Sequence, residues 1–141
     1  MCTPQTTDDE AVVRAYCDAW LAGDVMAVLA MYHDDLTLMW PGRHPLAGTY
    51  QGVSTAVEAL LALDAATNRV PVEVIDVLGG AHGAVAIVRE RWSRGDHDSI
   101  EVQRALHYTV RDGRLHTCRV FEFDQPSIDD WLAAAETPFR R

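Results

Sequence analysis

Positive charge and cysteine are both scarce in this chain of 141 residues, and long apolar runs are missing. Twelve Lys and Arg residues stand against 21 Asp and Glu residues, which gives a formal net charge of −9. Such a surface repels phosphate backbones and anionic lipid headgroups, so we expect no nucleic-acid partner and no membrane partner. No apolar run approaches the length that crosses a bilayer, so we expect no transmembrane segment.

The three cysteines, Cys2, Cys17 and Cys118, are widely spaced and form no C-x-x-C pair. An odd number at such spacing is typical neither of a disulfide framework nor of a zinc site. The first ten residues contain neither the basic region nor the apolar run of a signal peptide. We therefore expect reduced thiols and a cytoplasmic protein. We also expect no metal and no cofactor, because histidine spacing typical of metal sites and a glycine-rich phosphate loop are both absent.

Helical and alternating patterns divide the chain into a helical first half and a strand-rich second half. Three segments carry apolar side chains at helical spacing: 8–22, 25–32 and 54–63. A short strand-like run, 36–40, ends before Pro41. Four alternating, β-branched segments follow, separated by glycine-containing turns: 70–78, 83–92, 99–110 and 114–123. Residues 125–134 predict a final short helix.

This order of elements favours an α+β fold. Apolar residues make up 48% of the chain and charged residues 23%, which is ordinary for one globular domain. The antiparallel meander has one face to bury, and the N-terminal helices can cover it. We therefore expect a single domain over residues 1–141. It should be a cone-shaped, strongly curved antiparallel sheet, with N-terminal helices over its concave face enclosing a pocket.

Three stretches carry a resemblance to a known superfamily: "YCDAWLAGDVMAVLAMYHDDLTLMWPG", "HPLAGTYQGVSTAV" and "RDGRLHTCRVFEFD". In order and spacing they resemble the nuclear transport factor 2-like, or SnoaL-like, superfamily, over roughly residues 8–132. This group includes ketosteroid isomerase, scytalone dehydratase, limonene-epoxide hydrolase and polyketide cyclases. The resemblance implies the cone-shaped fold and a homodimer formed through the outer face of the sheet. It does not imply one activity, because the same pocket serves different reactions.

The resemblance to ketosteroid isomerase places Tyr16 at that enzyme's oxyanion-hole tyrosine. A buried phenol at this position implies hydrogen bonding to a developing enolate. The general-base aspartate of that enzyme falls at Trp40, and its second oxyanion-hole acid falls near Leu106. Because an indole cannot abstract a proton, the resemblance does not imply steroid isomerisation by the usual residues.

The resemblance to the hydrolase and the dehydratase is also incomplete. Arg91 falls at about the triad arginine of limonene-epoxide hydrolase, but the two water-activating aspartates fall near Ser93 and Val120. Scytalone dehydratase uses paired histidines, for which His44 and His107 are the analogous candidates.

The polar residues that could line a pocket are the candidate catalytic residues: Tyr16, His44, Arg91, Arg104, His107 and Glu122. Alternation along 99–110 places Arg104 on the apolar side and His107 on the outer side, unless a bulge reverses the parity. Glu122 is either a general base or the partner of an inward arginine in a structural ion pair. The candidate substrate-binding residues supply apolar surface, with core packing as the alternative: Trp20, Trp40, Tyr50, Trp92, Leu106 and Val120.

These residues favour a cofactor-independent acid/base enzyme that acts on a small, mostly apolar metabolite with a carbonyl or hydroxyl group. Isomerisation, dehydration and cyclisation are the expected reaction types. In this scheme Tyr16 and an arginine polarise an oxygen, and His44, His107 or Glu122 moves a proton. We expect Tyr16, His44, Arg91 and Arg104 to converge on one pocket. Three alternatives stay open. One is a non-catalytic module that binds a small hydrophobic molecule, and another is an epoxide hydrolase-like enzyme with an altered triad. The third is a structural or protein-interaction domain whose pocket is filled by large side chains such as Trp40 and Trp92.

Overall fold

The structure is a computed structural model that describes residues 8–134, and Cys2 lies outside this range. Its first two helices are α1 (Asp8–Ala22) and α2 (Val25–Ala30), joined by the predicted corner. Gly23 adopts a φ of 70° there, and the Asp24 carboxylate accepts a hydrogen bond from the Ala27 amide at 3.1 Å. The second helix is shorter than predicted, because Tyr32 pairs with Leu115 in the sheet and so belongs to a strand.

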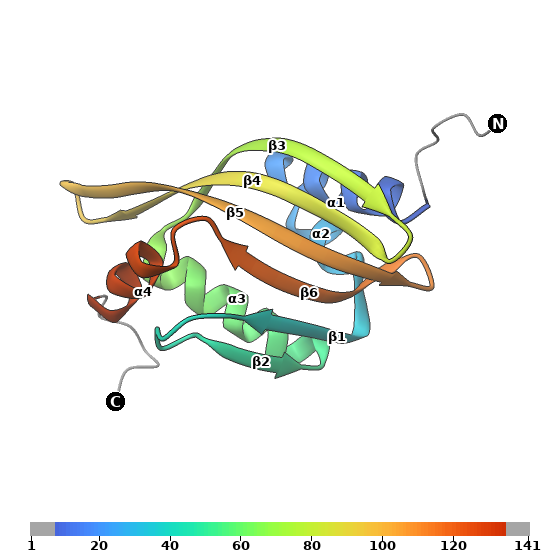
Figure 1. The fold of residues 1–141 in the computed structure, drawn as a ribbon, viewed down its shortest axis with the longest axis horizontal. Helices are drawn as coiled ribbons and strands as arrows, with labels where there is room; N and C mark the ends of the chain where they lie inside the picture. Colours follow the sequence, from blue (N-terminus) through green and yellow to red (C-terminus); the bar gives the residue numbers. More distant parts are fainter. Residues whose placement is uncertain (1–7, 135–141) are drawn as a thin grey trace.

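Six strands form one sheet in the order β2-β1-β6-β5-β4-β3 (Figure 1). Their bounds are β1 (Tyr32–Trp40), β2 (Gly48–Gln51), β3 (Val70–Gly80), β4 (Gly83–Arg94), β5 (Asp98–Arg111) and β6 (Arg114–Glu122). Strands β3 to β6 form the predicted antiparallel meander. Two details differ from the prediction. Strand β1 runs parallel to β6, and the short strand β2 pairs with β1 where the sequence predicted only a loop.

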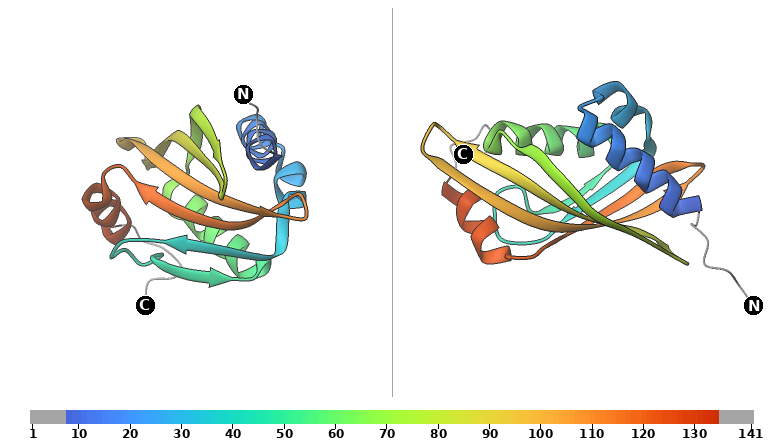
Figure 2. Two further views of the ribbon diagram at one scale, coloured as in Figure 1. Left: turned by 45° about the vertical axis from the view of Figure 1, so that its right-hand side comes forward. Right: turned by 90° about the horizontal axis from the view of Figure 1, so that it is seen from above.

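The helices α1, α2 and α3 (Val53–Thr67) lie over one face of the curved sheet, as Figure 2 shows in the view from above. The last helix, α4 (Gln125–Ala134), closes one end of the sheet (Figure 1). The predicted α+β architecture is therefore confirmed.

On β5 the side chains of Val102, Arg104 and Tyr108 are buried in alternation, so no bulge reverses the predicted parity. Within the described part of the chain, no helix is both long enough and apolar enough to cross a membrane.

Candidate functional site

A small enclosed cavity lies between the helices and the concave face of the sheet. Its volume is about 40 Å³, which at roughly 10–15 Å³ for each molecule is room for about three waters. Most of its wall is apolar, with Leu36, Leu38, Val88 and Val120 among the lining side chains. Its polar groups come from one helix, several strands and the connection that precedes β3: Tyr16, Tyr32, Arg69, Glu90, Arg104 and Tyr108. We call this space the inner cavity.

A larger open depression, the outer groove, lies between α1, α2, α3 and the start of β3. Its volume is about 520 Å³, within the range of sites that bind drug-sized molecules. Five residues line both spaces and define what we call the neck: Tyr16, Trp20, Tyr32, Leu60 and Arg69. The groove wall is mainly aliphatic, and its exposed residues include Val25, Leu61 and Val70. A ligand entering through the groove therefore passes a mainly aliphatic wall, on which Asp64 is the carboxylate, before it reaches the polar groups of the neck.

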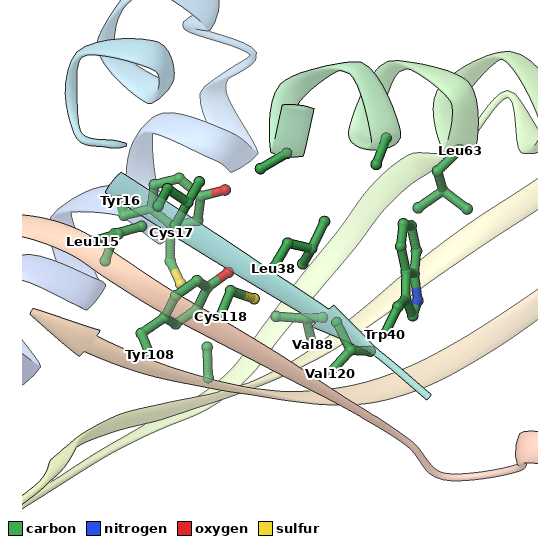
Figure 3. Close-up of a cluster of buried hydrophobic side chains, with 14 of the residues drawn as sticks. Tyr16, Cys17, Leu38, Trp40, Leu63, Val88, Tyr108, Leu115, Cys118 and Val120 are labelled. Carbon is green, nitrogen blue, oxygen red and sulfur yellow. The ribbon is translucent and has the colours of Figure 1, made fainter. Parts of the chain in front are cut away.

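The neck contains a pair of phenol hydroxyls. The Tyr16 and Tyr32 oxygens are 2.7 Å apart in a buried hydrogen bond. Burial raises the pKa of Tyr16 well above its usual range and, with a contribution from Tyr32, keeps that phenol neutral at physiological pH. The Tyr16 ring also packs edge-on against Tyr108, with ring centroids 5.5 Å apart. Figure 3 shows these two rings beside Cys17 and Cys118, with Trp40 farther along the sheet.

The two cysteines of this region are free, buried and close to the tyrosines. Burial raises the pKa of Cys17 to about 11 and that of Cys118 to about 12. Both side chains are therefore protonated thiols at neutral pH, and they contribute apolar surface rather than nucleophiles.

Arg104 lies at the base of the inner cavity and is held by two carboxylates. Its Nε and Nη2 donate to the two Glu122 oxygens at 2.9 and 3.0 Å, a paired contact across neighbouring strands. Its Nη1 lies 3.4 Å from Glu90 Oε2. The guanidinium also lies over the rings of Trp40 and Trp92, at 5.4 and 5.6 Å from their centroids. Arg104 is therefore committed mainly to Glu122.

Glu90 lines the inner cavity and is completely buried. Its Oε1 accepts a hydrogen bond from the Trp92 indole at 2.9 Å, whereas its contacts with Arg104 and Arg69 are longer, at 3.4–3.5 Å. Burial opposes ionisation of this carboxyl. The charges of Arg104 and Arg69, with the indole hydrogen bond, outweigh that effect and lower the pKa of Glu90. Glu90 is therefore a buried carboxylate that faces the cavity.

Arg69 links the neck to this charged group. Its Nε donates to Asp64 Oδ1 at 2.5 Å, and its Nη1 lies 3.5 Å from Glu90 Oε2. Beyond the ion pair with Glu90, neither terminal nitrogen has a hydrogen-bond partner among residues 8–134. Arg69 thus has N–H groups left for an oxygen atom that enters the neck.

The predicted site residues separate into several groups. Six line the inner cavity: Tyr16, Trp20, Trp40, Arg104, Leu106 and Val120. Trp92 is fully buried and acts on the site by its hydrogen bond to Glu90. Glu122 lies behind Arg104 with its side chain fully buried. Tyr50 lies apart from the cavity lining and donates from its hydroxyl to the Leu46 carbonyl at 2.7 Å.

His44, Arg91 and His107 lie outside the inner cavity. The His44 ring is buried against the far side of Trp40, at 5.9 Å between ring centroids, and its Nδ1 accepts from the Leu46 amide. Burial lowers the pKa of His44, so this imidazole is neutral at physiological pH. Arg91 is exposed because it alternates with inward Glu90 and Trp92 on β4. His107 projects from the outer face and contacts the His82 carbonyl at 3.2 Å. The expected convergence of four residues is thus limited to Tyr16 and Arg104.

Four polar residues of the inner cavity were absent from the sequence-based candidates: Tyr32, Arg69, Glu90 and Tyr108. Tyr32 was assigned to the end of a helix, and Arg69 follows the third helix without a motif. Glu90 had a usable signal, because alternation with Arg89 and Arg91 turns its side chain the opposite way. Among the described residues, no three His, Cys, Asp or Glu side chains are grouped as a metal site.

A family model for the SnoaL-like domain matches residues 13–117, and the chain belongs to this family. An uncharacterized protein of Mycobacterium tuberculosis is 30% identical over 131 residues, covering 90% of this chain and 99% of the relative. An NTF2-like protein from Burkholderia xenovorans has a similar structure, with a TM-score of 0.73 and 19% identity over 91% of this chain and 98% of the other. A protein from Jannaschia, provisionally named a SnoaL-like polyketide cyclase, has a TM-score of 0.72 at 16% identity, covering 95% and 97%.

Proposed function

We propose that the protein is a cofactor-independent acid/base enzyme that acts on a small, mostly apolar molecule with a carbonyl or hydroxyl group. The proposal is based on one observation, namely that acidic, phenolic and basic side chains line the same inner cavity. A fully buried carboxylate, Glu90, faces the same space as the Tyr16–Tyr32 hydroxyl pair and the Arg69 guanidinium. Isomerisation, dehydration and cyclisation are the reaction types that such a set supports, and structural relatives include one provisionally named a polyketide cyclase.

In the proposed mechanism the phenol pair and Arg69 hold the substrate oxygen at the neck. Two neutral hydroxyls and a guanidinium stabilise negative charge that develops on this oxygen when a neighbouring C–H bond breaks. Because the same proton transfer neutralises Glu90, the site as a whole gains no negative charge. Glu90 accepts the released proton, because it is the carboxylate that lines the cavity. Its carboxylate is already ionised, and its contacts with the arginines are long enough for one oxygen to turn toward substrate. Histidine is not needed in this scheme.

Hydrogen–deuterium exchange tests the proton transfer without knowledge of the natural reaction. A panel of cyclic and aryl ketones would be incubated with the protein in D₂O, and loss of the α-proton signal followed by ¹H NMR. The wild-type protein should accelerate exchange for the ketones that it binds. Glu90→Gln should reduce the rate by about a hundredfold or more, the usual scale for a lost general base. Tyr16→Phe should reduce it by about tenfold, because Tyr32 keeps one hydroxyl in place.

One further measurement and one control variant separate chemistry from binding. Quenching of tryptophan fluorescence gives ketone affinity, because Trp20 and Trp40 line the cavity. Glu58→Gln is the matched control, since Glu58 lies on the exposed side of α3. If every bound ketone exchanges at the rate of free solution, the enzyme proposal fails.

A non-catalytic binding module is the second candidate function. It is favoured by the pairing of Glu90 with two arginines and an indole, which lowers the basicity of the carboxylate. The same experiment separates the candidates, because a binding module would retain ketone affinity without accelerating exchange.

A water-adding enzyme with an altered triad is the third candidate. The resemblance placed Arg91 at the arginine of the hydrolase triad but left the two aspartates of that triad without counterparts. In the structure a different arginine, Arg104, lies between two carboxylates, Glu90 and Glu122. The inner cavity also has room for water beside Glu90. Incorporation of ¹⁸O from labelled water into the diol formed from an epoxide substrate would support this candidate over proton transfer.

A further inference from the structure

The charged groups at the neck form an alternating chain that continues into the interior. Asp64 pairs with Arg69, Arg69 with Glu90, Glu90 with Arg104, and Arg104 with Glu122. Three carboxylates therefore share two guanidinium groups, which leaves one negative charge in excess. The outermost member, Asp64, is half-exposed on the wall of the outer groove, and the other carboxylates are completely buried.

An anionic ligand group at the neck would add a second uncompensated negative charge. Arg69 is the cation nearest to the groove, and its charge is already shared between Asp64 and Glu90. A carboxylate entering from the groove would have to compete with Asp64, which lies 2.5 Å from Arg69 Nε. Like charges brought together in a partly buried site are strongly unfavourable. The neck is therefore a poor site for an anion although it contains an arginine.

An uncharged ligand oxygen is not repelled by the excess negative charge, and hydrogen-bond donors are present at the neck. Tyr16 and Tyr32 have two hydroxyl protons between them, and their mutual hydrogen bond uses one. Among residues 8–134 the structure gives neither hydroxyl another partner. Arg69 also lines the neck, and its terminal nitrogens supply further N–H groups there. One carbonyl oxygen can accept from both sources with its two lone pairs.

The volumes of the inner cavity and the outer groove determine how large the rest of the ligand can be. The inner cavity of about 40 Å³ admits only a few atoms, whereas the outer groove of about 520 Å³ accommodates a drug-sized body. Exposed aliphatic side chains gather around the groove: Leu21, Val25, Leu29, Leu61 and Val70. A ligand that places one oxygen at the neck must therefore leave a bulky apolar portion among these side chains.

We infer that Asp64 is a specificity-determining residue that selects uncharged ligands, in which a carbonyl oxygen at the neck is attached to a large apolar body. Asp64 neutralises Arg69 and so keeps carboxylates and other anions out of the neck. This inference rests on the proposed function for the existence of the binding site, but it concerns the charge of the ligand and not the reaction. Replacing Asp64 by a neutral side chain should turn the neck into an anion site, because Arg69 then lacks a partner in the groove.

A matched pair of probes tests the inference. 2-Acetonaphthone and 2-naphthoate share one ring system, and only the second is anionic at neutral pH. Affinities would be measured by tryptophan fluorescence at pH 7.5 and low salt. The wild-type protein should bind the ketone at least about tenfold more tightly than the carboxylate, as expected for one unfavourable charge in a partly buried site. Asp64→Asn should reduce this preference by about tenfold or reverse it.

Two variants guard against a structural explanation. Asp64→Glu retains the charge and should retain the ketone preference, and Glu58→Gln removes a charge from the same helix away from Arg69 and should leave the preference unchanged. The inference is overturned if wild type binds both probes equally, or if Asp64→Asn keeps the wild-type ratio. If wild type binds neither probe, the binding site of the proposed function is itself refuted, together with the inference.

Discussion

Arg104 is the residue on which the buried charges depend. It is only 2% exposed, and it contacts the two most deeply buried carboxylates, Glu90 and Glu122. Burial of a guanidinium is unfavourable, but these two negative charges outweigh it and raise the pKa of Arg104 above its usual range. Because two carboxylates rely on the same cation, its loss would affect more than one ion pair.

Arg104→Met should lower the free energy of unfolding by about 3–5 kcal/mol at pH 7, because it leaves buried carboxylates without their main partner. The deficit should shrink as the pH falls. In the wild-type protein the pKa of Glu90 is lower in the folded state, so its stabilising contribution is present at neutral pH and is lost on acidification below the usual glutamate range. In the variant Glu90 lacks the charge of Arg104, so this carboxyl takes up a proton more readily. Urea unfolding of the wild type and the variant at pH 7 and pH 5 measures the stability deficit and its decrease on acidification.

The control for this prediction is Arg119→Met, which removes an exposed arginine from the neighbouring strand β6. Its effect should stay below about 1 kcal/mol, as for other surface charges. A deficit for Arg104→Met as small as that of the control would contradict the role assigned to the buried charges.

At the scale of elements, the end of α3 places Arg69 in the neck. Asn68 has left-handed backbone angles, with φ 46° and ψ 41°, and its amide donates to the Asp64 carbonyl at 2.8 Å. Its side chain donates to the Ser93 carbonyl at 3.3 Å. This conformation stops the helix and turns the chain into β3, which brings Arg69 back toward Asp64 and Glu90. Asparagine is one of the few residues that adopt it readily.

Asn68→Ala should lower the free energy of unfolding by about 1–2 kcal/mol, because a Cβ without a compensating hydrogen bond is strained in the left-handed region. Asn68→Gly should have a smaller effect, since glycine adopts this region without strain. Thermal and urea unfolding of the two variants measure the difference. An alanine variant that equals or exceeds the glycine variant in stability would show that the backbone conformation does not limit this turn.

In the molecule as a whole, the outer face of the sheet carries a row of apolar side chains that no other part of the described chain covers. Ile87, Ala105 and Phe121 are cross-strand neighbours on β4, β5 and β6, and all three side chains project away from the inner cavity. Phe121 is 50% exposed and Phe123, beyond the end of β6, is 58% exposed. We propose that a second copy of the chain covers this row, in agreement with the homodimer implied by the family resemblance.

Phe121→Lys should convert such a dimer to a monomer in sedimentation velocity at micromolar concentration, because a charge would be buried at the centre of the row. Leu61→Lys is the matched control. Leu61 is 60% exposed but lies on the outer groove, so this variant should keep the wild-type oligomeric state. A wild-type protein that sediments as a monomer at the same concentration would exclude the proposed dimer.

Local sequence patterns were sufficient to predict the fold class, the order of the main helices and strands, and the direction of individual side chains on the long strands. The alternation of residues 99–110 correctly separated Arg104 from His107, because neighbouring residues on a strand must face opposite sides of a sheet. Helical spacing in the first segment likewise identified Tyr16 as an inward residue.

Which side chains meet depends on the packing of the elements. Tyr32 and Glu90 lie on separate strands and Arg69 in the connection between α3 and β3, and they converge with Tyr16 because the sheet curves beneath α1 and α3. His44 could not be placed from the sequence, because it follows a strand end and a loop whose path depends on the pairing of β1 with β2. Local patterns determine which way a side chain points from its own element. The partners that it meets, and so the chemistry of the site, depend on the relative positions of the elements.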